Sequence, residues 1–305
     1  KTQIARRNDE QSSIAIRTYK RLIYGRDSVY AREPEYETVE NISREDLTRF
    51  HERAYQGVNL LVGVVGDFDS KAIRPLLEQE FSVFPVGERI QVSPPPVEEK
   101  SAHSLHVVGK SDVNQSYILI GHLGGRRQNP DYGTLQVMNK ILSGGFSGRL
   151  FQKVRTEMGL AYSVFGRYGC NFFYPGMFYV GLKTKTAATA KTIRVVENEL
   201  ERLQKEVSSD ELEQAKEQFL NSLVFRYDQG EEILSRRMYY AYRDMDADSF
   251  RELIGKIREA TTDDVVRVAR DYVRPDSLTV LAVGEKEELV EQLRELGHVE
   301  VLPQP

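Results

Sequence analysis

The chain has 305 residues, of which 40% are hydrophobic and 29% charged, and its formal net charge is −4 with a pI near 5.9. This length predicts about two globular domains with sizeable cores, and the balanced charge provides no overall basic field that would attract nucleic acid. No run approaches the roughly 18 apolar residues of a membrane-spanning helix, and the single cysteine, Cys170, excludes an intrachain disulfide and is interpreted as a buried apolar residue.

The first residues, KTQIARRNDE, are typical of the inside of a helix rather than of a leader, so we expect the natural N-terminus to lie upstream of Lys1. Ser43 follows as a predicted N-cap, with Glu45 and Asp46 in the first turn of a one-faced helix. The apolar run LLVGVV at 60–65 then predicts a buried strand that ends at glycine.

This helix and strand occur twice. The segment ISREDLTRFHERAYQGVNLLVGVVGDF from Ile42 lies without a gap on ATTDDVVRVARDYVRPDSLTVLAVGEK from Ala260, so that Ser43 falls on Thr261. A second block, RRNDEQSSIAIR at 6–17, matches FRYDQGEEILSR at 225–236, with Asp9 on Asp228. A repeat of this length predicts duplicated domains rather than a solenoid.

The repeat divides the chain into residues 1–87, an incomplete first copy, and residues 105–305, a complete second copy, joined by the Pro-rich linker 88–104. In the second copy the patterns predict strands at 105–110, 116–124, 160–169 and 176–185, and helices at 130–142, 149–159, 186–206 and 208–226, with two more in 229–258. The predicted fold is α+β, a mixed and mostly antiparallel sheet in each domain with helices on one face.

The segment SGGFSGRLFQKVRTEMGLAYSVFGRY at 143–168 is the candidate for chemistry. A phosphate-binding loop is excluded, because the glycines are not followed by the Gly-Lys-Ser/Thr ending. From the residues alone, a glycine turn with Arg155 and Tyr162 on an ordinary surface would account for it.

The block LSGGFSGRLFQKVRTEMGLAYSV resembles the C-terminal-domain signature of the insulinase/pitrilysin family, which includes the mitochondrial processing peptidase. The resemblance implies a role for Arg155 and Tyr162: in that family, an Arg and a Tyr at this spacing bind the backbone carbonyls of the substrate near the scissile bond. Both side chains are donors suited to carbonyl oxygens.

The family's zinc motif, His-x-x-Glu-His, is absent from this sequence, and no Glu stands near Lys1 to Gln3, where the resemblance would place the distal ligand. The five histidines have other interpretations: His103 and His106 as solvated linker residues, His51 on a helix surface, and His122 as either packed or rim-exposed at a strand end; His298 also lies outside any such motif.

The resemblance therefore implies a zinc-less chain without a metal or cofactor of its own, inactive alone, that handles peptide beside a zinc-bearing partner chain or self-associates. Zinc is expected in that partner or in a missing front portion. The alternatives are a truncated catalytic chain and a scaffold subunit like the core proteins of the bc1 complex. If the source is bacterial, a periplasmic or other extracytoplasmic location is favoured.

Overall fold

The computed structural model describes residues 1–99, 102–226, 229–246 and 248–305. Their contacts divide the chain into two compact units that interleave along the sequence. Unit 1 consists of Lys1–Glu33, Pro95–Phe219 and Leu253–Pro305, and unit 2 of Pro34–Pro94 and Leu220–Glu252. The chain thus passes between the units twice within helices. The boundaries predicted at 87 and 105 separate two duplicated domains, which are not the same as these compact units, so they stay a prediction.

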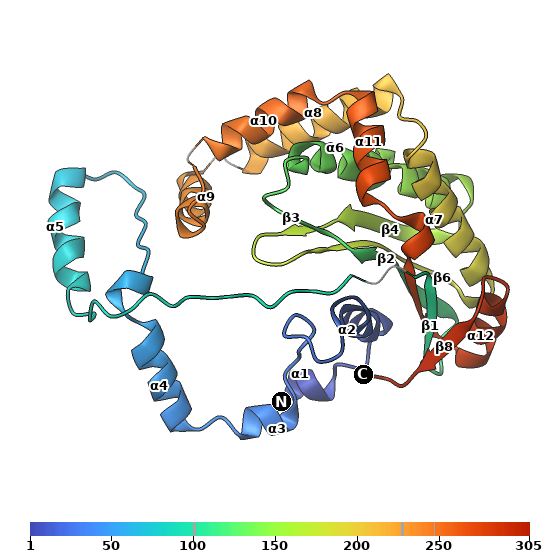
Figure 1. The fold of residues 1–305 in the computed structure, drawn as a ribbon, viewed down its shortest axis with the longest axis horizontal. Helices are drawn as coiled ribbons and strands as arrows, with labels where there is room; N and C mark the ends of the chain where they lie inside the picture. Colours follow the sequence, from blue (N-terminus) through green and yellow to red (C-terminus); the bar gives the residue numbers. More distant parts are fainter. Residues whose placement is uncertain (100–101, 227–228, 247) are drawn as a thin grey trace. The chain divides into compact units, whose positions relative to one another are not determined.

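Unit 1 is built on a six-stranded sheet of order β4-β6-β2-β7-β1-β8 (Figure 1). β2 pairs antiparallel with β6 and β7, and β6 antiparallel with β4, whereas β1 is parallel to β7 and β8. The predicted mixed, mostly antiparallel sheet is therefore confirmed. Its strands are β1 (Ser104–Gly109), β2 (Gln115–Leu123), β4 (Ala161–Tyr168), β6 (Met177–Lys185), β7 (Thr279–Gly284) and β8 (Val299–Leu302), and a small parallel pair is β3 (Gly125–Arg126) with β5 (Cys170–Asn171).

Most helices of unit 1 cover one face of this sheet and enclose the larger core. Strand residues of one parity, such as Ile118, Phe178 and Val280, point into this core and are fully buried. The covering helices are α6 (Tyr132–Ser143), α7 (Thr189–Leu203), the first part of α8 (Ser209–Arg226), the second part of α10 (Ser249–Glu259), α11 (Thr262–Tyr272) and α12 (Lys286–Arg294). The helices predicted over 130–142, 186–206, 208–226 and 229–258 are thereby confirmed, and α12 and β8 are additional.

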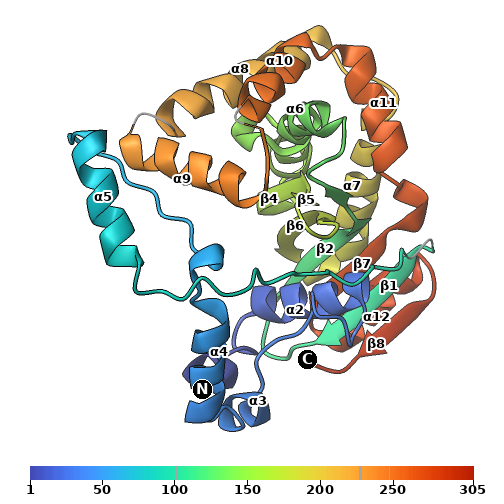
Figure 2. The same cartoon turned by 60° about the vertical axis from the view of Figure 1, so that its left-hand side comes forward.

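On the other face of the sheet, the helix that the described residues form is α2 (Gln11–Tyr24), which lies across β2 and β7 (Figure 2). Its apolar stripe, including Ile14, Tyr19 and Ile23, packs against Leu119 and Leu281 in a second, smaller core. Helices therefore flank both faces of this sheet, whereas the sequence pattern predicted them on one face. The difference arises because α2, which belongs to the first copy in the sequence, packs on the sheet of the second copy.

Unit 2 consists of helices and extended segments. Its helices are α3 (Tyr36–Glu40), α4 (Arg44–Ala54), α5 (Ser70–Phe81), α9 (Gly230–Tyr242) and the remaining parts of α8 and α10. α9 passes so close to Gly63 that an added Cβ would meet the side chains of Leu234 and Met238. The helices that contain parts of the two repeated blocks have similar contacts: α2 packs on β7 of the second copy, and α9 packs on residues 60–65 of the first. Asp228, the predicted counterpart of Asp9, lies outside the described residues.

The prediction of a buried strand at 60–65 is wrong. These residues form no strand among the described residues, and Val62 is 46% exposed, whereas its repeat counterpart Val280 is fully buried between β1 and β2. The reason is that the described part of unit 2 supplies no neighbouring strands. In the same way Phe50 is 67% exposed, while its counterpart Val268 is fully buried.

The helices that precede these segments confirm the predicted caps. Ser43 accepts a hydrogen bond from the amide of Asp46, and Thr261 accepts one from the amide of Asp264, each at 3.1 Å. In both copies the N-cap amide in turn donates a hydrogen bond to the carboxylate of the same Asp, which completes a capping box. The local sequence signal therefore forms the same structure in two different surroundings.

Candidate functional site

The candidate segment places Arg155 on an unusually wound helix. Residues Phe151–Glu157 form a π-helix, in which the amide of Met158 donates to the carbonyl of Lys153 at 3.2 Å. Such turns are rare and are frequent at functional sites. Gly159 ends the helix with φ of +60°, a backbone conformation that favours glycine. The predicted helix 149–159 is thus confirmed in place, with a different winding.

Tyr162 lies at the start of β4, which is an edge strand of the sheet. Ala161 pairs with Thr184 and Val164 with Leu182, so β4 carries one extra residue between these pairs. This β-bulge leaves Tyr162 and Ser163 both exposed, and bulges commonly re-aim side chains at functional sites. Tyr162 is 82% exposed as a result.

The π-helix and the bulge bring the two predicted site residues together. The guanidinium carbon of Arg155 lies 4.5 Å from the ring centroid of Tyr162 and 4.7 Å from that of Phe151. Phe151 in turn meets Phe146 of the glycine turn edge to face, at 5.0 Å between centroids. These four side chains form a continuous stack, in which the cation–π contacts orient the guanidinium.

The remainder of the outer edge of β4 is protected by α6. Ser143 Oγ accepts a hydrogen bond from the amide of Gly166 at 2.9 Å. The side chain of Asn139 accepts one from the amide of Tyr168 at 2.6 Å and donates another to its carbonyl at 3.1 Å. Edge strands with free main-chain groups invite pairing, and these bonds remove that opportunity at the far end of β4. The part of the chain that the structure describes forms no such side-chain bonds to the end near Tyr162.

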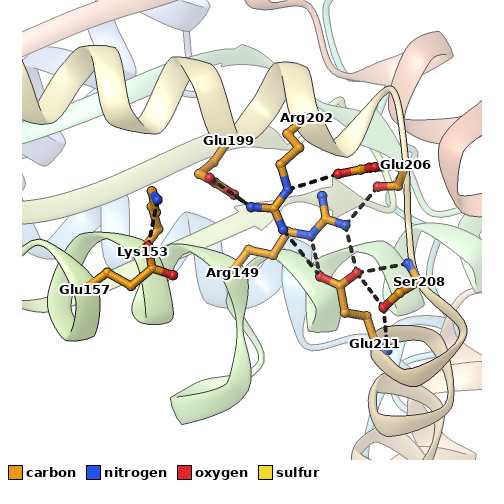
Figure 3. Close-up of polar contacts among 8 residues, drawn as sticks. All are labelled: Arg149, Lys153, Glu157, Glu199, Arg202, Glu206, Ser208 and Glu211. Carbon is orange, nitrogen blue, oxygen red and sulfur yellow. Dashed lines mark hydrogen bonds and ion pairs between the residues drawn. The ribbon is translucent and has the colours of Figure 1, made fainter.

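A polar network anchors the start of the helix that carries Arg155 (Figure 3). Arg149, whose side chain is only 3% exposed, donates two hydrogen bonds to Glu211, at 2.6 and 2.9 Å, and one to the carbonyl of Glu206 at 2.8 Å. Burial alone would raise the pKa of Glu211, but the hydrogen bonds from Arg149 and Ser208 lower it to about 2. The ion pair therefore fixes the glycine turn and the π-helix to α8.

Arg202 extends this network along α7. It donates two hydrogen bonds to the buried Glu199, at 3.1 and 3.2 Å, and lies 4.0 Å from Glu211. On the π-helix itself, Lys153 pairs with Glu157 at 2.6 Å. These residues were not predicted from the sequence, although the spacing Ser208-x-x-Glu211 is a capping-box signal that would have marked Glu211.

The histidines are dispersed and do not fit a zinc site. His103 pairs with Glu197 at 3.3 Å, and His51 stacks on Tyr55 at a helix surface, as predicted. His122 is buried at the end of β2, the packed one of its two predicted positions, and burial lowers its pKa to about 4. Among the described residues there is no group of three His, Cys, Asp or Glu side chains that could hold a metal.

One histidine interpretation is wrong. His106 belongs to β1 and is buried, and its Nδ1 lies 3.1 Å from a carboxylate oxygen of Glu300 on β8. His106 lies within the strand predicted at 105–110 rather than in the linker, and the parallel neighbour β8 covers its ring. Cys170 is half-buried against the main core, and burial raises its pKa to about 11.

The sequence matches a family model described as the peptidase M16 inactive domain over residues 41–219, more than half of the chain. A protein of Rickettsia bellii named as an uncharacterized zinc protease is 30% identical over 188 residues, which cover 61% of this chain and 44% of the relative. A Helicobacter pylori protein named as the non-peptidase homolog YmxG is 25% identical over 253 residues, covering 82% of this chain and 57% of that relative. The chain thus spans about half the length of such curated relatives.

Solved structures show the same fold at low sequence identity. A crystal structure titled as a peptidase M16 inactive domain from Pseudomonas fluorescens has a TM-score of 0.84 at 21% identity, covering 93% of this chain and 68% of that one. A chain of complex III2 from Candida albicans has a TM-score of 0.76 at 18% identity, covering 96% and 70%. No helix in the described part of the chain has the length and apolar character needed to cross a membrane.

Proposed function

This chain belongs to the peptidase M16 family, and we propose that it is a peptide-handling subunit that presents Arg155 and Tyr162 to a substrate held by a zinc-bearing partner. The observation that supports this most directly is the contact between the two side chains on an exposed edge, with 4.5 Å between guanidinium and ring. An ordinary surface would not require a π-helix before Gly159 and a β-bulge after it.

The pair has the chemistry to hold a peptide backbone. A guanidinium is always charged and carries five N–H donors, and a phenol adds one O–H donor. Donors aimed at a carbonyl oxygen strengthen their hydrogen bonds as that oxygen becomes negative, and one such donor lowers the barrier by about 3 kcal/mol. Because backbone carbonyls occur at every residue, this contribution is independent of the substrate's side chains.

The zinc itself is assigned elsewhere in this proposal. The described histidines are too dispersed to hold it, so the metal would be bound by a second chain or by a segment upstream of Lys1. Names such as zinc protease among the relatives support metal chemistry in the family. If an upstream segment of the same polypeptide binds the zinc, this chain would be part of a catalytic peptidase chain. We also propose a periplasmic or other extracytoplasmic location.

A scaffold function is the second candidate. The relative named as a non-peptidase homolog and the fold shared with a chain of complex III2 favour it. A scaffold would need the interface surfaces of the family but not the donors of Arg155 and Tyr162. The two functions therefore differ in what happens when only those donors are removed.

The experiment is reconstitution with a family chain that carries His-x-x-Glu-His, followed by steady-state peptide hydrolysis. We expect Arg155→Ala and Tyr162→Phe each to lower kcat by about tenfold or more, with little change in relative preference among peptides. Arg155→Lys should lower it too, because an ammonium cannot reproduce the fork. Arg194→Ala, which removes an exposed arginine of α7, is the matched control. Full activity of both site variants would support the scaffold instead.

A further inference from the structure

One half of the sheet face that carries α2 is open. α2 covers β2 and β7, while β4 and β6 continue beyond it. Side chains of one parity on β4 and β6 point into the main core, among them Val164 and Leu182. Those of the other parity lie on the open half. Those that are exposed are Tyr162, Ser163, Phe165 and Arg167 on β4, and Lys183 and Lys185 on β6. Met177 and Tyr179 of β6 are only partly exposed, because they pack against the smaller core, and Gly181 is buried.

The charge on this open face is of one sign. Arg167, Lys183 and Lys185 are exposed, and none forms an ion pair with a carboxylate of the described residues. None of these residues is Asp or Glu, although the chain as a whole has a net charge of −4. By contrast, cations on the helical side, such as Arg149 and Arg202, are paired. The open face is therefore a concentrated positive surface on an acidic protein.

Aromatic rings lie between these cations. Phe165 lies over Gly181, where an added Cβ would collide with its ring, and it meets Tyr179 edge to face at 5.8 Å. Arg167 is directly opposite Tyr179 in the strand register. At the other end the surface continues into Tyr162 and Arg155. The missing side chain at residue 181 is thus what allows the aromatic ring to lie flat on the sheet.

We infer that the open face of β4 and β6 binds an acidic, extended polypeptide segment, so that the unit selects peptides by negative charge. Side chains two residues apart on one strand face are about 7 Å apart, which is also the spacing of same-side side chains in an extended peptide. Acidic residues would meet Arg167 and Lys183, with apolar residues on Phe165. The inference rests on the proposed function and names the substrate class at the same site.

The surface fits a peptide better than a nucleic acid or an anionic membrane. Three unpaired cations at strand spacing supply few of the phosphate contacts on which nucleic-acid affinity depends. The face also lacks the amphipathic helix with which proteins enter a lipid interface. Both of these alternatives are outcomes of the experiment.

The test is direct binding to the whole chain, measured by fluorescence anisotropy. The probe is an extended, labelled peptide of about ten residues, enough to follow β6, with Glu at every second position and Phe and Ser between. Its matched analogues carry Gln or Lys in place of Glu. We expect the Glu peptide to bind most tightly, more weakly at higher salt. The double substitution Arg167→Gln, Lys183→Gln should weaken binding about threefold to tenfold.

Lys191→Gln is the matched control, because it removes an exposed lysine from α7 on the opposite side of the sheet. Binding by this variant should equal that of the unchanged chain. Charge reversal by Arg167→Glu with Lys183→Glu should turn the preference toward the Lys peptide, and an unchanged circular dichroism spectrum would show that the variant is folded.

Equal affinity for the Glu and Gln peptides, an equal loss with Lys191→Gln, or tighter binding to single-stranded DNA or to phosphatidylserine vesicles would each overturn the inference. If the unchanged chain shows no preference for the Glu peptide, but Arg155→Ala weakens binding of the Glu and Gln peptides alike, the inference fails and the proposed function stands. A preserved charge preference with no effect of Arg155→Ala on turnover in the reconstituted complex would overturn the proposed function alone.

Discussion

Replacing Glu211 by Gln tests how the helix that carries Arg155 is held in place. In the unchanged chain the carboxylate accepts two hydrogen bonds from Arg149, whose side chain is only 3% exposed. Glutamine has nearly the same shape but no charge. The guanidinium would remain buried, with the carbonyl of Glu206 and one amide oxygen as its neutral acceptors.

The structure allows the loss to be estimated in two ways. Removing one partner of a buried ion pair costs about 3–5 kcal/mol, and the remaining neutral acceptors reduce this to about 2–3 kcal/mol. The folded pKa of Glu211, about 2 against an ordinary value of 4.5, corresponds to about 3 kcal/mol as an upper bound, because the side chain is 28% exposed and water screens it. We expect a loss of about 2–3 kcal/mol at pH 7.

The pH dependence has a definite sign. The folded pKa of Glu211 lies below its unfolded value, so the stabilisation is fully present above about pH 4.5 and is lost as the pH falls towards 2. The unchanged chain should therefore lose about 1 kcal/mol of this contribution by pH 4 and about 2 kcal/mol by pH 3. Glu211→Gln has no such group, so the difference between the two proteins should shrink on acidification.

Urea unfolding followed by circular dichroism at pH 7 and pH 4 measures both quantities. Glu213→Gln is the control, since Glu213 lies on the same helix and its side chain, which pairs with Lys216, is 64% exposed; its cost should stay below about 0.5 kcal/mol. A Glu211→Gln protein as stable as the control, or a difference that does not change with pH, would refute the view that this ion pair anchors the site.

Three further predictions follow from single features. Gly159→Ala should cost about 1 kcal/mol in urea unfolding, because φ of +60° is unfavourable for alanine; an unchanged midpoint would contradict this. Asn139→Ala should cost about 1–3 kcal/mol and promote self-association in light scattering, because it exposes the edge groups of Tyr168; an equally stable monomer would argue against edge protection. Finally, metal analysis of the dialysed chain should find no stoichiometric zinc, and one tightly bound zinc per chain would disprove the zinc-less assignment.

The candidate site was accessible from the sequence only in part. The spacing of Arg155 and Tyr162 around Gly159 predicted that a helix and a strand would carry them, and both elements are present. The bulge was not predictable, because it depends on the pairing of β4 with β6 and not on a local residue pattern. The π winding was not predictable either, since no residue pattern recognised in this segment marked it. Arg149 and Glu211 escaped notice because they are 62 positions apart and meet only when α8 folds back.

The sequence by itself determined whatever depends on near neighbours in the chain. Ser43 and Thr261 form the same capping box in both copies, because each cap needs only the next three residues. Only the tertiary structure decided which apolar segments are buried. Val62 and Val280 occupy equivalent repeat positions, yet one is half exposed and the other enclosed between two strands. The physical reason is that an apolar segment is buried only when other segments pack against it, and the neighbouring strands come from elsewhere in the chain.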